Sequence, residues 1–303
     1  MSAKRGKRKN SVFTVIILLL VISTLVFSAL NNPSNQDKPE SAATDKGDNI
    51  VVHFLDVGQG DSTFIEFPDG RCMLIDAGLS EYAQTVIDSI EGYGYSGLDY
   101  VVATHPHADH IGGMSKVISH FDIGEIYMPK VSTTTKTFEK LLMAIGDKGM
   151  KINTAKAGVQ VYGDSSLKIE FLAPVYENYE ELNNYSAVLK ITYGKNSFLF
   201  TGDAENLSED EMLANRYSAL DCDVLKVAHH GSRYSSDTQF LNAVTPDYAV
   251  ISCGSDNSYG HPHKEAVDRL NHCGAKLYNT AENGAVTVYC DGNDSFEIMC
   301  ANE

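Results

Sequence analysis

Residues Thr104-His105-Pro106-His107-Ala108-Asp109-His110-Ile111-Gly112-Gly113 decide the fold of this chain. An apolar, β-branched run over residues 98–103 precedes them and predicts a buried strand. The apolar spacing from Ile111 to Phe121 predicts a helix after them. The polar side chains therefore occupy a loop at the carboxyl end of a strand, where open α/β sheets place their ligands.

The loop has the composition of a metal site, because it crowds three imidazoles and a carboxylate into six residues. His105 and His107, two residues apart, can converge on one metal ion. Asp109 and His110 would then turn toward a second ion. The alternative is a polar loop whose histidines face water, but matching polar residues follow other predicted strands further along the chain and favour metal binding.

This pattern, HxHxDH after a strand, resembles the signature of the metallo-β-lactamase superfamily. The chain is similar in particular to the hydrolase domain of ComEC-type DNA-uptake proteins and to free-standing relatives of that domain. Four further stretches carry the resemblance: Leu55–Ser62, Thr201–Asp203, Ala228–Ser232 and Tyr259–His263. The resemblance implies an α/β fold, the αββα sandwich of the superfamily, over residues 49–303.

The remaining periodicity agrees with one sizeable α/β domain. Further strands are predicted at residues 50–57, 62–67, 71–75, 166–173, 187–193, 197–201, 223–228, 247–252, 286–290 and 296–300. Further helices are predicted at residues 134–149 and 263–272.

The resemblance also implies a ligand set for two divalent metal ions, Zn or Mn. His105, His107 and Asp203 would hold the first ion; Asp109, His110, Asp203 and His229 would hold the second, with Asp203 as the bridge. His229 is preferred over its neighbour because the ligand in similar proteins heads an H-x-G turn. His230 is then expected beside the ligands or facing the substrate.

One departure from the superfamily concerns the first metal. Most two-metal members supply a further histidine between HxHxDH and the bridging aspartate, but this interval contains only His120. The corresponding stretch, residues 183–189, resembles the Asn/Ser version of the ComEC-like branch, with Asn184 and Ser186 as supporting residues. The first site is then a ligand short. This predicts weak binding, an extra water or a preference for manganese, and argues against a β-lactamase.

Several other polar residues are candidates for support or catalysis. Asp76 is expected to orient the HxHxDH loop, or only to form a turn. Asp61 would orient a ligand or water, or only hold its glycine-rich turn. Ser232, with Arg233 beside it, could bind an anionic substrate.

The catalytic set comprises Asp109, His261 and His263. His263 or His261 would donate to phosphoryl oxygens or to the leaving group. The structural alternative makes His261 a turn residue and His263 a helix cap.

The N-terminal region predicts export. Residues 1–11 form a basic cytoplasmic tail, and residues 12–30 are an uncharged apolar run long enough for one N-terminal transmembrane helix. An uncleaved anchor fits this length, and a cleaved signal peptide is the alternative. Residues 31–48 have the composition of a flexible linker. The domain is therefore expected outside the cytoplasm, membrane-anchored through residues 12–30 or secreted.

Charge bears on the substrate. The chain has 24 basic and 40 acidic residues, and five of the basic ones but none of the acidic ones lie in the first 31. The remainder holds 19 against 40, a net charge of −21. No basic stripe of the kind that binds nucleic acids is visible. The six cysteines follow no metal-binding spacing, and both disulfides and free thiols remain open.

Together these features predict an exported, metal-dependent hydrolase that attacks a phosphodiester with a metal-bound hydroxide. DNA is the first candidate substrate, and a cell-wall polymer, as in phosphocholine esterases, is the second. A non-catalytic metal-binding module is the remaining alternative. No protein partner is evident.

Overall fold

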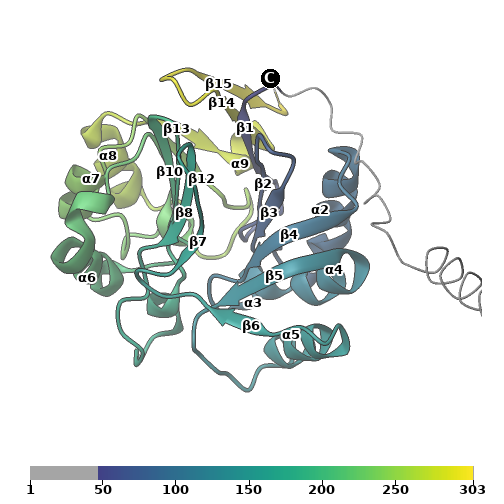
Figure 1. Ribbon diagram of the computed structural model, residues 1–303. Coiled ribbons are helices and arrows are strands. Elements are labelled where there is room, and N and C mark those ends of the chain that lie inside the picture. Colours follow the sequence, from purple (N-terminus) through teal and green to yellow (C-terminus); the bar gives the residue numbers. More distant parts are fainter. Residues whose placement is uncertain (1–46, 303) are drawn as a thin grey trace, which may run out of the picture. The chain divides into compact units, whose positions relative to one another are not determined.

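Two β-sheets lie face to face in the computed structural model, which describes residues 47–302, and helices cover the outer side of each sheet (Figure 1). This arrangement confirms the predicted αββα sandwich. The predicted tail and membrane segment, and nearly all of the linker, lie outside the described residues. Within residues 47–302, no helix has both the length and the apolar character needed to cross a membrane.

The first sheet has eight strands. In spatial order they are β15 (Phe296–Cys300), β14 (Val286–Cys290), β1 (Ile50–Phe54), β2 (Thr63–Glu66), β3 (Cys72–Ile75), β4 (Gly97–Val102), β5 (Asp122–Met128) and β6 (Ile152–Thr154). Its helices are α2 (Ala83–Gly92), α3 (Ala108–Ile111), α4 (Met114–His120) and α5 (Lys136–Asp147).

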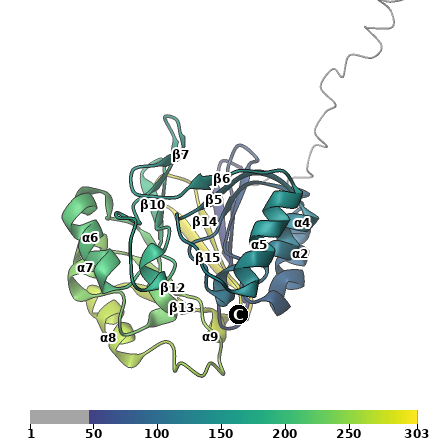
Figure 2. The same cartoon turned by 90° about the horizontal axis from the view of Figure 1, so that it is seen from below.

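The second sheet has seven strands. In spatial order they are β13 (Lys276–Asn279), β12 (Tyr248–Ile251), β11 (Val224–Lys226), β10 (Asn196–Phe200), β9 (Leu189–Tyr193), β8 (Leu167–Phe171) and β7 (Gln160–Gly163). Its helices are α6 (Asn206–Arg216), α7 (Thr238–Val244) and α8 (Lys264–Cys273), and a short α9 (Thr280–Asn283) follows β13. Figure 2 shows α6, α7 and α8 on the opposite side of the molecule from α4 and α5.

Three apolar layers hold the sandwich together. The layer between the sheets contains Phe54 from the first sheet and Phe171 and Phe200 from the second, each fully or almost fully buried. Outer layers join each sheet to its helices. Strand residues alternate between the inner and outer layers because successive side chains point to opposite faces of a sheet.

Parallel pairing brings the site loops together. Strands β3 to β6 pair in parallel, and so do β10 to β13. The remaining pairs of both sheets are antiparallel. Parallel neighbours end at the same edge of their sheet. Residues after β3, β4, β10 and β11 therefore emerge at sheet edges where they can meet.

The predicted elements recur with shifted ends, and some elements were not predicted. The helix expected over residues 111–121 is divided into α3 and α4 by Gly112 and Gly113. A Cβ on either glycine would collide with a backbone carbonyl oxygen, of Ala108 and Ala77 respectively. Helix α5 begins after Thr135, whose hydroxyl accepts a hydrogen bond from the Phe138 amide at 3.3 Å. The sequence prediction omitted α2, α6, α7, β5, β6, β7 and β13.

Candidate metal centre

The loops after four strands converge on one group of histidines and aspartates. The HxHxDH residues follow β4 of the first sheet, and Asp76 follows the neighbouring β3. Asp203 follows β10 of the second sheet, and His229 and His230 follow β11. Two separate sheets thus contribute side chains to a single candidate centre.

The first group of possible metal ligands is His105, His107 and Asp203. One ligand atom from each residue lies within 4.8 Å of the others. The Nε2 atom of His105 is 3.7 Å from Asp203 Oδ2 and 2.9 Å from His107 Nδ1. These are the three residues that the sequence assigned to the first metal.

The second group is Asp109, His110, Asp203 and His230. The Nε2 atom of His110 is 3.2 Å from Asp203 Oδ1. The Nε2 atom of His230 is 3.3 Å from Asp109 Oδ2 and 3.7 Å from Asp203 Oδ1. Asp203 belongs to both groups, as expected of a bridging carboxylate.

The histidine of this second group differs from the predicted one. His230, not His229, lies among the four residues, and His230 is almost completely buried. The reason is local backbone conformation: both residues are left-handed, with φ of 48° and 53°, so their side chains leave the loop in different directions. The geometry therefore favours His230 as the ligand that accompanies Asp109 and His110.

Outer hydrogen bonds orient the histidine rings. The Nδ1 atom of His110 is 2.7 Å from Asp76 Oδ2, and Asp76 also accepts from the Thr104 amide at 2.9 Å. The Nδ1 atom of His105 is 3.1 Å from Thr104 Oγ1, and that of His230 is 2.9 Å from the carbonyl oxygen of Ser252. A partner at Nδ1 directs Nε2 inward, as in metal-binding histidines. Asp76 thus lies where it can orient the His110 ring, and its supporting role stays a prediction.

Buried atoms without partners show that the residues fit a metal ion. Within the described part of the chain, His110 Nε2, His230 Nε2 and Asp203 Oδ1 are buried and form no hydrogen bond of good geometry, although the two nitrogens lie 3.2 and 3.7 Å from Asp203 Oδ1. Buried polar atoms are rarely left without partners. Imidazole nitrogens and a carboxylate oxygen are suitable ligands for zinc, manganese or iron. A divalent ion between these three atoms would satisfy all of them.

The electrostatics of the second group also favour positive charge. Burial disfavours the charged imidazoles, but Asp203 and other carboxylates outweigh it, and they raise the pKa of His230 to about 10. The pKa of His110 likewise lies well above its ordinary value. Burial raises the pKa of Asp203, but His110 and His230 more than offset this and hold it well below its ordinary value. A divalent cation could replace these imidazolium protons.

The remaining predicted residues surround the two groups. Ser186 Oγ accepts from the Asp203 amide at 3.0 Å and so supports the bridge. Asn184 accepts from the Ser208 amide, and Ser232 accepts from the Tyr234 amide. Both of these contacts hold loops, and the supporting or substrate-binding roles of Asn184 and Ser232 stay predictions.

His261 and His263 form the outer part of the centre. The His261 ring centroid lies 5.4 Å from that of His229 and 6.0 Å from that of His230. His263 Nδ1 accepts from the Arg233 amide at 3.1 Å. His263 occupies the N-cap position of α8, as the structural alternative had it, but its side chain forms no capping hydrogen bond in this described segment.

Sequence reasoning missed a buried lysine in this centre. Lys226 Nζ lies 2.7 Å from Asp61 Oδ2, and both side chains are almost completely buried. Asp61 Oδ1 lies 3.2 Å from His230 Nδ1. The signal was a lysine within the apolar strand that leads to the two histidines, where a charged residue needs a buried partner. Asp61 therefore has a supporting role that depends on Lys226.

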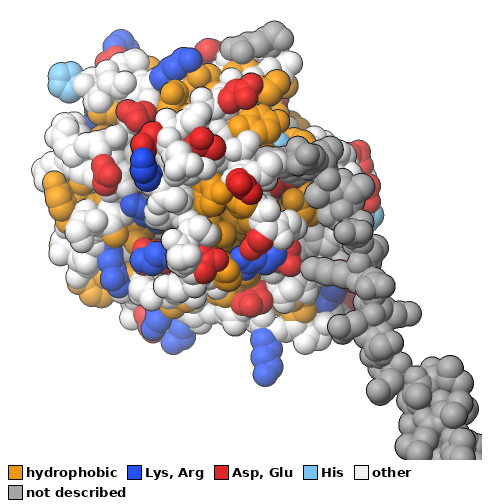
Figure 3. All heavy atoms as spheres, turned by 45° about the horizontal axis from the view of Figure 1, so that its top comes forward, with side chains coloured by type: hydrophobic (Ala, Val, Ile, Leu, Met, Phe, Trp, Pro, Cys, Tyr) orange, Lys and Arg blue, Asp and Glu red, His pale blue; other side chains and the backbone are white. Residues whose placement is uncertain are grey.

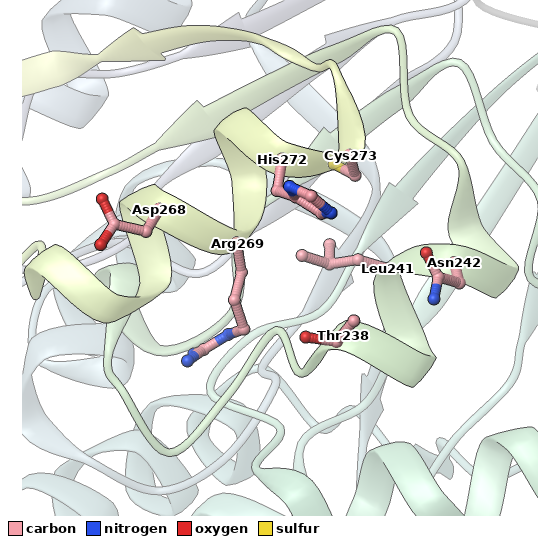
Figure 4. Close-up of a pocket in the computed structure, with 7 residues that line it drawn as sticks. All are labelled: Thr238, Leu241, Asn242, Asp268, Arg269, His272 and Cys273. Atoms are coloured by element: carbon pink, nitrogen blue, oxygen red, sulfur yellow. The ribbon is translucent and has the colours of Figure 1, made fainter.

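A cavity elsewhere in the described residues is separate from these groups. It has a volume of about 290 Å³ and lies between α7 and α8, with Leu241, Asp268, Arg269 and His272 among its lining residues (Figure 4). Arg269 donates hydrogen bonds to the carbonyl oxygens of Ser235 and Ser236. None of the lining residues belongs to the groups that could hold a metal.

The fold and the two groups define a class of protein. Residues 55–255 match the family described as the metallo-beta-lactamase superfamily, and the chain belongs to that superfamily. The solved structure of CmlA, a diiron beta-hydroxylase from Streptomyces venezuelae, has the same fold with a TM-score of 0.51. It is 16% identical and covers 76% of this chain and 52% of its own. This likeness concerns the fold alone.

Two curated relatives are similar over most of the chain. ComE operon protein 3 of Bacillus subtilis (strain 168) is 31% identical over 252 residues, which are 78% of this chain and 32% of that protein. Competence protein ComA of Neisseria gonorrhoeae is 31% identical over 237 residues, with the same two shares. The predicted similarity to ComEC-type competence proteins is confirmed. The chain spans about a third of the length of these relatives.

Proposed function

We propose that this chain is a metal-dependent hydrolase of phosphodiesters that uses two divalent ions, Zn or Mn. One observation carries the proposal: two groups of possible ligands share Asp203, and atoms of His110, His230 and Asp203 are buried without hydrogen-bond partners. Membership in the metallo-β-lactamase superfamily supports hydrolysis. The phosphodiester is our inference.

A bound divalent ion would lower the pKa of a coordinated water toward neutrality, which is the chemistry that hydrolysis requires. The chain's own residues would orient the reactants. His261 lies beside the histidines of the centre, and burial together with His230 and His229 lowers its pKa to about 4. It is therefore neutral at pH 7, and a neutral imidazole can donate one hydrogen bond to a phosphoryl oxygen.

DNA is the first candidate substrate, because the curated relatives are named for competence. The acidic balance of the chain limits how tightly it would bind a polyanion. On the face shown in Figure 3, acidic and basic side chains are interspersed and form no basic stripe. We therefore expect efficient cleavage of small phosphodiesters and weak DNA cleavage that salt suppresses further.

We retain a second candidate, a phosphodiester of a cell-wall polymer, by the likeness in fold to phosphocholine esterases. Membrane anchoring through residues 12–30, or secretion, belongs to the proposal and rests on sequence alone. A non-catalytic metal-binding module is the alternative that the assay below would reveal.

The test uses the full chain purified in detergent and loaded with Mn²⁺ or Zn²⁺. Hydrolysis of bis-p-nitrophenyl phosphate is expected with at least one of these metals, and not after chelation. Asp203→Ala is the matched control, because it removes the residue common to both groups. Two bound ions without turnover of any phosphodiester would leave the binding module as the better description.

A further inference from the structure

The two oxygens of Asp203 face different histidines. Oδ1 lies 3.2 Å from His110 Nε2 and 3.7 Å from His230 Nε2. Oδ2 lies 3.7 Å from His105 Nε2 and 3.7 Å from His229 Nε2. A carboxylate that bridges two ions gives one oxygen to each. His229 therefore lies on the side of the first group, and His230 lies on the side of the second.

The first group needs another ligand. It has three residues, whereas the second has four. The histidine in the interval before Asp203, His120, cannot supply it, because its Nε2 atom pairs with Glu91 at 2.8 Å and both side chains are exposed. His229 lies outside this group, but its Nε2 atom is 3.7 Å from Asp203 Oδ2. This is the same oxygen that His105 Nε2 approaches at 3.7 Å.

The outer nitrogen of His229 is held by a carboxylate. Nδ1 lies 3.1 Å from Glu205 Oε1, and that oxygen also accepts a hydrogen bond from Asn183 Nδ2 at 2.9 Å. Metal-binding histidines commonly pair their outer nitrogen with a carboxylate, which fixes the ring and leaves the other nitrogen for the ion. Asn183 belongs to the stretch where the expected histidine is missing. This stretch therefore supports His229 through Glu205.

The backbone of the turn holds the two histidines against different oxygens of Asp203. His229 and His230 are both left-handed, which is uncommon for residues with a side chain. The His229 amide donates to the carbonyl oxygen of Gly202 at 3.0 Å, and the Ser232 amide donates to that of His229 at 2.8 Å. These bonds tie the turn to the loop that carries Asp203.

We propose that His229 is the additional protein ligand of the first metal ion, with Glu205 as its positioning residue, and that His230 serves the second. The inference rests on the proposed two-metal function. In most two-metal members of the superfamily this ligand is a histidine that precedes the bridging aspartate, in the stretch that corresponds to residues 183–189. Here His229, which follows Asp203 in sequence, would take its place. His229 is not among the three residues whose ligand atoms lie within 4.8 Å of one another, so coordination of the first ion would require its ring to shift toward His105 and His107.

The experiment measures metal content and affinity in the full chain, independently of turnover. Zinc is titrated into chelated protein against a competing chelator, and bound zinc is counted by elemental analysis. Wild type should bind two ions. His229→Ala should weaken one of them by about 10²-fold or more, and Glu205→Gln should weaken the same one by about 10–100-fold. Thermal unfolding of each chelated variant shows whether it is folded.

Paired variants assign the site. In a His105→Ala background, which has lost the first ion, His229→Ala should change the remaining affinity by less than about threefold, whereas His230→Ala should abolish it. In a His110→Ala background, which lacks a ligand of the second ion, His230→Ala should change the remaining affinity by less than about threefold, whereas His229→Ala should abolish it. Retention of two tightly bound ions by His229→Ala would overturn the inference, and so would loss of the remaining ion by His229→Ala in the His105→Ala background.

Failure of this inference differs from failure of the proposed function. If His229→Ala keeps both ions but loses hydrolysis, His229 acts on the substrate and the proposed function stands. If the predicted metal losses occur in a protein that hydrolyses no phosphodiester, the ligand assignment stands and the proposed function is wrong.

Discussion

The buried pair of Lys226 and Asp61 offers the sharpest test of the energetics of this centre. Their side chains are 3% and 6% exposed, and Nζ and Oδ2 are 2.7 Å apart. Lys226 Nζ also donates to the carbonyl oxygen of Val227 at 3.0 Å. Lys226→Met keeps most of the side-chain volume and removes the charge, so Asp61 loses its closest cation and keeps only the imidazole of His230, whose Nδ1 lies 3.2 Å from Asp61 Oδ1.

The expected loss of stability follows from this geometry. At 2.7 Å and an effective dielectric constant of about 20, the attraction between the two charges is about 6 kcal/mol, and the cost of removing both from water offsets much of it. Removing one member of a buried pair typically costs about 3–5 kcal/mol, because an uncompensated charge remains. Because His230 still compensates part of the Asp61 charge, we expect Lys226→Met to lower the free energy of unfolding by about 3 kcal/mol, the low end of this range.

Urea unfolding of the chelated full chain, followed by circular dichroism, measures this loss. The double variant Asp61→Asn/Lys226→Met should be more stable than the sum of the single losses predicts, by about 1–3 kcal/mol. Lys130→Met is the matched control: Lys130 pairs with Glu177 at 3.2 Å but both are exposed, so its loss should cost less than about 1 kcal/mol. A cost below about 1 kcal/mol for Lys226→Met, or strictly additive losses, would refute the reasoning.

Three further predictions concern the site and its surroundings. Asp203→Ala should lose both metal ions and all hydrolysis; two ions per chain by elemental analysis would contradict the shared role of Asp203. Burial raises the pKa of Glu209 to about 8, against an ordinary 4.5, so its contribution to stability is present in full below about pH 4.5 and is lost as the pH rises through 8. Glu209→Gln should remove this pH-dependent loss of stability, so the melting temperature of the variant should fall less than that of wild type between pH 5 and pH 8.5. Parallel plots of melting temperature against pH for the two proteins would contradict this prediction. A Cβ on Gly60 would collide with the carbonyl oxygen of Asp109, so Gly60→Ala should weaken zinc binding by about tenfold or more. Gly146→Ala, which has open space, is its control, and equal affinities would show that this close approach is unimportant.

Much of the fold was predictable because its signals are local. Strands β4, β10 and β11 are short apolar runs that end in polar residues, and the HxHxDH pattern placed the site at one such end. Strand β5 was missed because Gly124 and Glu125 interrupt its apolar pattern, and its position depends on pairing with β4. Pairing between distant segments leaves little trace in local composition.

Most residues of the candidate site could be predicted from the sequence, but the metal ion that each histidine would bind could not. The sequence identified both His229 and His230, but their roles depend on two consecutive left-handed residues that no side-chain pattern specifies. The partner of Lys226 is Asp61, from a distant turn, so the ion pair exists only once the two sheets are packed. The supporting position of Glu205 likewise depends on the turn that carries His229.

The origin of the candidate ligands in two sheets has a consequence for the lifetime of the protein. Each ion would link a loop of the first sheet to Asp203 of the second, so the sheets could not separate until the ions were released. Binding only to the folded state would add about 4 kcal/mol to stability at a free metal concentration a thousandfold above the dissociation constant. Metal supply would thus set the protein's resistance to unfolding and proteolysis as well as its proposed hydrolytic activity.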